Sequence, residues 1–573
     1  MTENYLQCGN KKLIYDEACL HIYNTAESSV HIFSQSTDCH QCSLEPLMEI
    51  LPADHRTEII QTTYRTIFQF SFNNSFFKNT FVFEQHGHYG INISNSGISE
   101  LSEILPANSA NGPLFTFLWI LFGGWILWFI GSYIFTYTQL YIRLFQPRLI
   151  VNEAENDLGA ISRSGASTPI LSDLSREICA NRRIQSLDVF RGITISLMLF
   201  VNYGGGKYWI FQHSTWNGIT IADVIFPWFA WIMGTSIMLS LNAHLRNSVT
   251  KGTLLMKVFL RSLALCAIGI ILNSIKNNNT VTLRFPGVLQ RLALAYLIVA
   301  SLETLFISTQ NRYDIPRTLK KIQDWLYSWI QWIFMLILVG FYCFGLFCIK
   351  VPGCPTGYLG PGGLHKNSSY INCTGGSAGY IDRQIFTFKH LYNSTSLRQV
   401  YHTQIPFDPE GLLGILTTAL TMFLGAHAGR IVLCYTNPKG RIIRWAFMAV
   451  ITGVIAGHLC GWSKEGGSMP LNKNLWTVSF ALATSSMAFC MKIFLFLFID
   501  CKKWWSGAPF HQVGKNAILI YIGSIITKEA IPWNWTPLDL TTHSHMLWMN
   551  VWSTSLWIVI ALLLDRWSVY ISI

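Results

Sequence analysis

Residues 186–242 have the sequence SLDVFRGITISLMLFVNYGGGKYWIFQHSTWNGITIADVIFPWFAWIMGTSIMLSLN. We expect a first apolar helix that ends near Asn202, about 16 Å beyond Arg191 and therefore past the midplane of a bilayer core about 30 Å thick. A second apolar helix is expected from near Ile219 to Leu241. The stretch thus predicts two membrane helices joined by a turn at one boundary of the membrane.

The turn between these helices concentrates polar side chains and glycines. They are Asn202, Gly204, Gly205, Gly206, Lys207, His213, Trp216, Asn217 and Asp223. An amide at the depth of Asn202 is costly unless it has a partner, and glycines let the backbone approach a ligand closely. We therefore take this turn as the candidate site.

The composition of the whole chain is that of a polytopic membrane protein. Of the 573 residues, 51% are hydrophobic and only 12% are charged, whereas soluble proteins carry about 25% charged residues. The formal charge of +11 is spread over several short loops, which fits the excess of Lys and Arg on cytosolic loops. No basic cluster accompanies a nucleic-acid-binding module, so we predict no nucleic-acid partner.

Apolar spans of membrane length recur along the chain. They lie near residues 114–137, 189–204, 221–241, 253–273, 287–308, 325–349, 411–428, 443–461, 475–499, 512–526 and 547–565. The sequence therefore predicts an α-helical polytopic membrane protein with about eleven transmembrane helices. An odd number of spans places the two termini on opposite sides of the membrane.

Charge and glycosylation signals agree on the orientation of these helices. Loops rich in Lys and Arg follow the spans that end near residues 308, 428 and 499, and such loops stay in the cytosol. The sequons fall on the other side. Their acceptor residues are Asn73, Asn92, Asn278, Asn367, Asn372, Asn393 and Asn534. We therefore expect glycans at these positions, away from the cytosol.

Residues 1–113 are polar and show strand alternation, so we expect a small β-rich domain outside the cytosol. Its four cysteines, Cys8, Cys19, Cys39 and Cys42, allow three disulfide pairings. Cys39 and Cys42 also have the spacing of a redox or zinc pair, but the chain supplies no second ligand pair spaced for a metal. We predict structural disulfides in this domain.

The rest of the chain divides into three parts. We expect a first transmembrane helix at 114–137, a flexible cytosolic linker at 138–187 and a multi-helix transmembrane domain at 188–573. Within the last part, residues 350–409 form a Gly-rich loop on the side away from the cytosol. Cys354 and Cys373 bracket a Gly-rich segment of this loop, and we expect them to be bonded to each other in an oxidising compartment.

Several motifs resemble those of the heparan-alpha-glucosaminide N-acetyltransferase family. In the opening stretch they are DVFRG, FVNYGGGKYW with FQHSTWNG, and ADVIFPWF. Later motifs are RFPGVLQR, CPTGYLGPGG, NCTGGSAGYIDR, FDPEGLLG, FLGAHAG, PLNKNLWTVSF and GKNAILIYIG. These strings are long and rare in composition. The resemblance extends from about Ser186 to the C-terminus, and the N-terminal third matches only in general layout.

The resemblance implies a lysosomal membrane acetyltransferase with a lumenal N-terminal domain and a cytosolic C-terminus. Such an enzyme moves the acetyl group of cytosolic acetyl-CoA to the terminal non-reducing α-glucosamine of heparan sulfate. His213 falls on the family's proposed catalytic histidine, and Asn202 falls on an active-site asparagine. Asp223 could orient the imidazole of His213, or it could only complement the dipole of its helix.

Acetyl-CoA would approach this site from the cytosol, because its phosphates cannot cross hydrocarbon. A pantetheine arm between helices would bring the thioester to Asn202 and His213. From topology alone, we place the nucleotide near Arg246, Lys251 and Lys515. No HExxH motif and no clustered carboxylates occur, so we predict no metal cofactor. The sequence leaves the oligomeric state open, a homodimer included.

Two other classes of protein are compatible with the sequence. Many helices with intramembrane polar residues also describe a transporter of a small polar solute or acyl compound, although no internal repeat supports inverted halves. A membrane scaffold or receptor could use the β-rich domain as its ligand binder. His427 and His458 lie in apolar spans, where packing or hydrogen bonding between helices is expected.

Overall fold

The structure is a computed structural model. It describes residues 6–72, 75–95, 97–145, 184–276, 279–307, 319–392, 395–537 and 539–571. The chain divides into two compact units, one of which combines Met1–Asn108 with Ile184–Ile573, while the other is Ser109–Arg183. The predicted sequons at Asn73, Asn278 and Asn393 lie outside the described residues, as do positions 146–183 of the linker predicted at 138–187, whereas positions 138–145 of that linker are helical.

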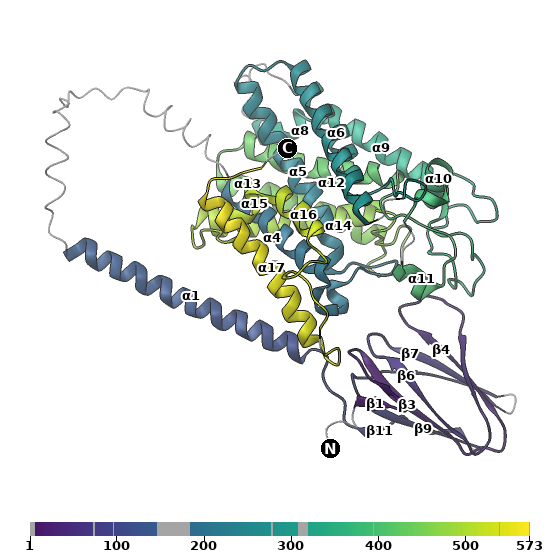
Figure 1. Cartoon of the computed structure of the whole chain (residues 1–573). Helices are drawn as coiled ribbons and strands as arrows, with labels where there is room; N and C mark the ends of the chain where they lie inside the picture. The colour runs from purple at the N-terminus through teal and green to yellow at the C-terminus, as the bar shows by residue number, and fades with distance from the viewer. Residues whose placement is uncertain are drawn as a thin grey trace, which may run out of the picture. The chain divides into compact units, whose positions relative to one another are not determined.

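The N-terminal region is a sandwich of two β-sheets (Figure 1). Its strands are β1 Gln7–Cys8, β2 Lys11–Lys12, β3 Glu17–Asn24, β4 Val30–Ser36, β5 Glu45–Ile50, β6 His55–Gln61, β7 Thr66–Phe72, β8 Ser75–Phe81, β9 His88–Ser94, β10 Gly97–Ile98 and β11 Ser102–Leu105. One sheet has the order β10-β9-β3-β6, with β11 also paired to β9, and the other has the order β5-β4-β7-β8. β1 and β2 form a separate hairpin.

The alternation in the sequence produces this sandwich. Phe68 and Phe70 of β7 and Ile91 and Ile93 of β9 are fully buried in the core between the sheets, whereas Asn92 is exposed. Side chains of a strand point alternately to its two faces, so one face of each strand supplies the core. The predicted β-rich domain is confirmed. Of the three possible cysteine pairings, the structure contains Cys8–Cys19 with Cys39–Cys42.

The rest of the chain is largely helical. The longer helices are α1 Gly112–Phe145, α4 Gln185–Tyr203, α5 Ile221–Arg246, α6 Lys251–Lys276, α7 Val288–Phe306, α9 Trp329–Phe347, α12 Leu413–Cys434, α13 Pro438–Leu459, α14 Val478–Leu495, α16 Ala517–Ile526 and α17 His543–Arg566. Shorter helical segments are η2 Gly205–Lys207, η3 Trp209–Phe211, η4 Leu319–Ile322, α8 Gln323–Leu326, α10 Gly376–Phe386, η5 Phe388–His390, α11 Thr395–Tyr401, η6 Phe496–Cys501 and α15 Phe510–Lys515.

Each of the eleven apolar spans predicted from the sequence contains a helix. Among the described residues, eight helices are long and apolar enough to cross a membrane. They are α5, α6, α7, α9, α12, α13, α14 with η6, and α17. The multi-pass membrane architecture is therefore confirmed. The full number of eleven is not, because α16 has only ten residues, α4 carries polar residues near its start, and the apolar stretch of α1 is described only over Gly112–Trp128.

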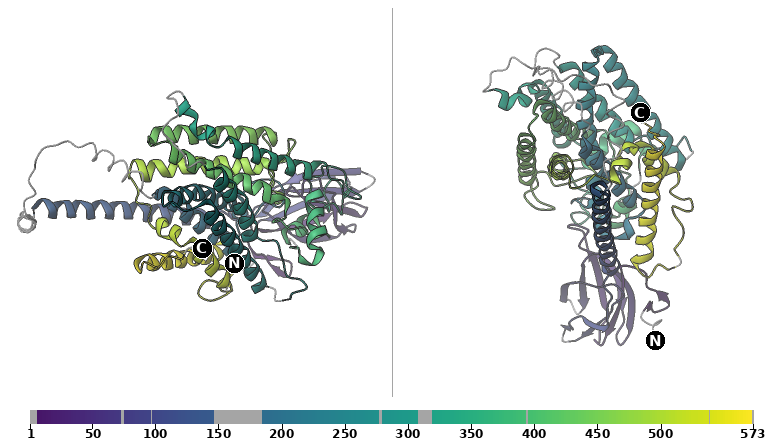
Figure 2. Two further views of the ribbon diagram at one scale, coloured as in Figure 1. Left: turned by 90° about the horizontal axis from the view of Figure 1, so that it is seen from above. Right: turned by 90° about the vertical axis from the view of Figure 1, so that its left-hand side faces the viewer.

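Glycines set the spacing of the helices that carry the candidate site. A Cβ on Gly234 of α5 would lie 1.8 Å from the Met422 carbonyl oxygen, and a Cβ on Gly425 of α12 would lie 1.9 Å from that of Trp231. Small residues allow two helix backbones to approach this closely. The helices of this unit lie side by side in both views of Figure 2. α5 is thus fixed against α12, and with it the turn that precedes α5.

Candidate functional site

The turn between α4 and α5 is built around glycines in left-handed backbone conformations. Gly205 and Gly206 have φ of 59° and 64°. A Cβ on Gly205 would lie 2.5 Å from that of Phe211, and the Gly206 amide donates a 3.0 Å hydrogen bond to Asn550 Oδ1 of α17. We expected these glycines to admit a ligand. In the structure they allow the turn to close on itself and to pack against α17.

Asp223 is the buried centre of the site. Its side chain is fully buried, and Oδ1 lies 2.9 Å from His213 Nδ1. Oδ2 accepts hydrogen bonds from the backbone amides of Ser214 at 3.1 Å and Thr220 at 3.2 Å. The bond from Thr220 is part of a capping box at the start of α5. Asp223 therefore has both of the roles that the sequence allowed, since it caps the helix and contacts the imidazole.

Lys473 is a third member of the site, and the sequence analysis did not single it out. Its Nζ lies 2.8 Å from His213 Nδ1, 3.3 Å from His213 Nε2 and 3.4 Å from Asp223 Oδ1. It belongs to the segment between α13 and α14, and its side chain is only 14% exposed. The motif PLNKNLWTVSF contains this lysine, but 260 positions separate it from His213. We call His213, Asp223 and Lys473 the His213 site.

The electrostatic surroundings favour an uncharged imidazole in the His213 site. Burial lowers the pKa of His213, and the ammonium of Lys473 lowers it as well, whereas the hydrogen bond with Asp223 and the carboxylates of Asp223 and Glu410 oppose the change. Half of the His213 side chain remains exposed, 52% of its surface. Burial therefore lowers the pKa of His213 less than it would lower that of an enclosed ring, and the charge of Lys473 is the cause that is specific to this position.

A cluster of buried charges lies close to the His213 site. Arg284 donates hydrogen bonds to both carboxylate oxygens of Asp408, at 2.7 and 2.6 Å, and also contacts the carboxylate of Glu410. Glu410 interacts electrostatically with both His213 and Lys473. The motif FDPEGLLG supplies both acids, but the sequence alone gave no reason to connect them to His213.

The N-terminal domain and the segment 350–409 both hold the turn that carries His213. Asp38 accepts a hydrogen bond from Thr215, and Trp216 Nε1 donates one to the Leu359 carbonyl at 2.8 Å. Within this segment the structure joins Cys354 to Cys373. Two disulfide-containing regions therefore pack around the His213 site.

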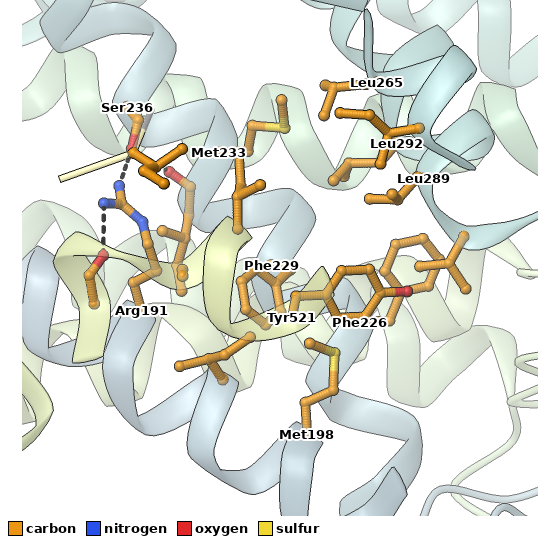
Figure 3. A pocket seen from close by; sticks show the side chains of 18 of the residues that line it. Arg191, Met198, Phe226, Phe229, Met233, Ser236, Leu265, Leu289, Leu292 and Tyr521 are labelled. Atoms are coloured by element: carbon orange, nitrogen blue, oxygen red, sulfur yellow. Dashed lines mark hydrogen bonds between the residues drawn. The ribbon is translucent and has the colours of Figure 1, made fainter. Parts of the chain in front are cut away.

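A cavity of about 210 Å³ lies between α4, α5, α6, α7, α15 and α16, and we call it the helix cavity. Among the residues that line it are Arg191, Ile195, Met198, Phe226, Phe229, Met233, Ser236, Arg261, Leu265, Leu289, Leu292, Lys515 and Tyr521. Figure 3 shows Arg191 and Ser236 on one side, with Leu265, Leu289 and Leu292 across the cavity. The lining is therefore mostly apolar, with cations at a few positions.

α5 contributes residues both to the helix cavity and to the His213 site. Phe226, Phe229, Met233 and Ser236 line the cavity at helical spacing. Asp223 lies in the first turn of α5, about 4.5 Å along the helix axis before Phe226. The helix cavity and the His213 site are therefore about one turn apart along the same helix.

α4 lies beside α5 and runs in the opposite direction, as the 2.8 Å hydrogen bond from Arg191 Nη2 to Ser236 Oγ shows at one end of the pair. Ile195 and Met198 line the cavity from α4, and Asn202 is the next position on that face. The side chain of Asn202 is exposed and forms no hydrogen bond with the described residues. Asn202 thus lies at the same end of the helix pair as Asp223, without a hydrogen bond to the His213 site.

Topology alone predicted three basic residues near the nucleotide of acetyl-CoA. In the structure these residues have different surroundings. Lys515 lines the helix cavity and donates a 2.9 Å hydrogen bond to Asp565. Arg246 is exposed at the end of α5, and Lys251 donates to the Leu305 carbonyl at 3.0 Å. Neither of these two is among the described residues that line the cavity.

Arg261 of α6 lines the helix cavity and was missed by the sequence analysis. Its guanidinium lies 5.1 Å from the centre of the Tyr296 ring. Its buried Nε has no hydrogen-bond partner among the described residues. An arginine inside an apolar membrane span is itself a signal of function, and that signal was available in the sequence.

One group of possible metal ligands occurs in the described residues, formed by Cys19, His21 and His88. Cys19 is bonded to Cys8 and has no thiolate to offer. The two histidines stack on each other, with Nε2 of His21 3.1 Å from Nδ1 of His88. This group therefore does not support a metal site.

Comparison with known proteins gives two strong similarities. The chain is 34% identical over 585 aligned residues to a Mus musculus protein named heparan-alpha-glucosaminide N-acetyltransferase, and this alignment covers 97% of the chain and 89% of the mouse protein. It is 43% identical over 397 residues to a Homo sapiens protein of the same name, where the alignment covers 68% of the chain and 59% of the human protein. No family model matches the chain.

Proposed function

Because this chain belongs to the heparan-alpha-glucosaminide N-acetyltransferase family, a family of acyltransferases, we propose that it transfers the acetyl group of acetyl-CoA to the terminal glucosamine of heparan sulfate. The observation that carries the proposal is that α5 contributes to both regions. It lines a mostly apolar cavity that has cations in its lining, and it supplies the buried carboxylate that pairs with His213. This arrangement suits a donor that enters from one side of a membrane and an acceptor that enters from the other.

The helix cavity fits the donor chemically. Arg191, Arg261 and Lys515 line it, and the unpaired Nε of Arg261 offers a buried donor for an anionic group. Apolar side chains such as Met198 and Phe229 would contact a flexible, uncharged arm. Acetyl-CoA supplies an activated thioester carbonyl, and its phosphates would stay at the end where the cations lie.

His213 would remove a proton from the acceptor amine. When Nδ1 of His213 donates to Asp223 Oδ1, the Nε2 lone pair is free to accept that proton as the nitrogen bonds to the acetyl carbon. The C–S bond of the donor then breaks, and His213 can return the proton to the leaving sulfur. Asn202, at the end of the cavity face of α4, would donate a hydrogen bond to the carbonyl oxygen as its negative charge grows.

We further propose that the His213 site faces the lysosomal lumen and that the C-terminus is cytosolic. The sequon residues Asn92, Asn367 and Asn372 are exposed. They belong to the N-terminal domain and the segment 350–409, the two disulfide-containing regions that hold the His213 turn. Both features fit an oxidising, glycosylating compartment. A loss of glycosidase-sensitive mass in Asn367→Gln would support this orientation, and cleavage of the linker 146–183 only from the lumenal side would contradict it.

The function is tested with the purified full chain in liposomes. Release of free CoA thiol from acetyl-CoA is measured with a heparan oligosaccharide that ends in glucosamine, and again with the same oligosaccharide after chemical N-acetylation of that sugar. We expect release only with the free amine, together with transfer of labelled acetyl to the sugar. Equal release with both oligosaccharides, or uptake of the solute without transfer, would overturn the proposal and favour a hydrolase or a transporter.

A further inference from the structure

We propose that Lys473 is a positioning residue of the His213 site, whose fixed positive charge keeps His213 able to accept a proton in an acidic compartment. The inference rests on the proposed function, because it concerns the base of that reaction. It assigns to this lysine a role that the chemistry at low pH requires. An unperturbed imidazole has a pKa of about 6.5 and would be largely protonated in an acidic lumen.

The geometry restricts which groups Lys473 can pair with. Nζ of Lys473 is within 3.3 Å of both ring nitrogens of His213, so a protonated ring would place two positive charges side by side. An ammonium has only donors. It therefore cannot share a hydrogen bond with Nδ1 while Nδ1 donates to Asp223. The arrangement is consistent when Lys473 pairs with Asp223 Oδ1, 3.4 Å away, and His213 is neutral.

Three charged groups face His213, each from a different element packed against the ring. Asp223 approaches from the start of α5, Glu410 from the segment before α12, and Lys473 from the segment before α14. The two acids stabilise the imidazolium, and of these three charges only the lysine opposes it. Without Lys473 the charges around His213 would favour the charged ring, and only the partial burial of the ring would oppose it. The lysine thus counteracts the carboxylate that orients the base.

The test compares Lys473→Met with Lys473→Arg in the purified full chain. In Lys473→Met, the acid limb of the kcat/KM profile should move to higher pH. At pH 5, kcat/KM should fall at least about tenfold, while the loss at pH 7.5 is much smaller, because a shift of one unit changes the fraction of neutral base about tenfold. Lys473→Arg keeps the charge and should recover most of the acid limb. Lys389→Met, at an exposed lysine of η5, is the matched control and should leave the profile unchanged.

A second readout does not depend on activity. Diethyl pyrocarbonate modifies only the unprotonated imidazole, so the rate at which mass spectrometry detects modified His213 reports its protonation at each pH. The midpoint of this rate should rise in Lys473→Met and stay near the wild-type value in Lys473→Arg. A uniform loss of activity at all pH values with an unchanged modification midpoint would show that Lys473 is merely structural, and would overturn the inference.

The two proposals fail in different ways. If the wild-type chain does not acetylate glucosamine at any pH, the proposed function is wrong, whatever the titration of His213. If the wild-type chain acetylates glucosamine and Lys473→Met has the same pH profile and the same modification midpoint, the function stands and the role of Lys473 is wrong.

Discussion

The His213 site and the helix cavity both include residues of α5, but their buried charged groups differ in whether the protein satisfies them. At the His213 site, the carboxylate of Asp223 is fully buried and is surrounded by donors from His213, Ser214 and Thr220. In the helix cavity, the Nε of Arg261 is buried without a hydrogen-bond partner among the described residues. The buried carboxylate of the His213 site is therefore satisfied without a ligand, whereas the guanidinium of Arg261 would be stabilised by a bound anion.

This difference separates chemistry from donor binding along one helix. A residue that moves a proton must be held in one orientation before substrate arrives, and the bonds of Asp223 do this for His213. A cation that binds an anionic ligand is most useful when no protein group satisfies it. Substitutions in the two regions should therefore change different kinetic constants.

The largest effect is expected for His213→Ala. Loss of a positioned base typically costs 10²- to 10⁴-fold in rate, so kcat should fall at least about 100-fold. Expression, glycosylation and binding of CoA should persist, because half of the side chain is exposed and it supports no buried core. Single-turnover kinetics and calorimetric titration with CoA measure these two properties separately. Normal turnover by this variant would remove His213 from the mechanism.

Asn202→Ala tests the same reaction from α4, the other helix of the pair. Removal of one oxyanion donor costs about 10²- to 10³-fold in kcat. The exposed side chain makes no hydrogen bond in the described structure, so stability should not change. A loss confined to KM would place Asn202 in donor binding instead, on the cavity side of the comparison.

Arg261→Gln is expected to have a smaller effect of the opposite kind. If Arg261 binds an anionic part of the donor, a lost charge-assisted hydrogen bond should raise KM for acetyl-CoA by about tenfold or more. kcat should stay within about twofold, because the residue lies away from His213 along the helix cavity. Lys251→Gln is the matched control, since Lys251 does not line the cavity. A fall in kcat at saturating donor would show that the two regions are not separable in this way.

The sequence predicted secondary-structure elements better than it predicted contacts between distant residues. The alternation around Phe68 and Phe70 was enough to predict the β-rich domain, and helical spacing with DVFRG and ADVIFPWF was enough to predict α4 and α5. Local patterns determine such elements because they depend on neighbours along the chain. The contact between Asp223 and His213 was open to prediction for the same reason, since ten positions separate them.

Contacts between distant segments were not predictable in this way. Lys473 reaches His213 only because α14 and the segment before it fold back onto α5, and nothing near residue 473 indicates that. For the glycines of the turn, the contact that the sequence suggested differs from the one in the structure. Their sequence suggested a ligand, but their space is filled by Phe211 and α17, which only the tertiary structure reveals.

The last prediction concerns stability and no kinetic constant, and it involves Asp382, which interacts electrostatically with Asp408 of the charge cluster close to the His213 site. Burial raises the pKa of Asp382 in α10 to about 7; the hydrogen bond from the Leu412 amide at 2.9 Å opposes this shift, and the nearby charge of Asp408 adds to it. A carboxyl group with a raised pKa in the folded state binds a proton on folding. Its contribution to stability is therefore largest in acid and is lost as pH rises from about 4 toward 7.

Asp382→Asn should remove this pH dependence while keeping the acceptor for the Leu412 amide. Between pH 5 and pH 7, the wild-type chain should lose about 2 kcal/mol more of its unfolding free energy than the variant, because each unit of pH is worth about 1.4 kcal/mol for one proton until the folded carboxyl is half ionised near pH 7. His365, in the same segment, acts in the opposite sense, since burial lowers its pKa to about 4. It is common to both proteins, so it cancels in the difference. Unfolding in detergent at the two pH values, with the exposed Glu529→Gln as control, measures the effect, and equal pH dependence in wild type and Asp382→Asn would show that Asp382 is ionised in the folded protein.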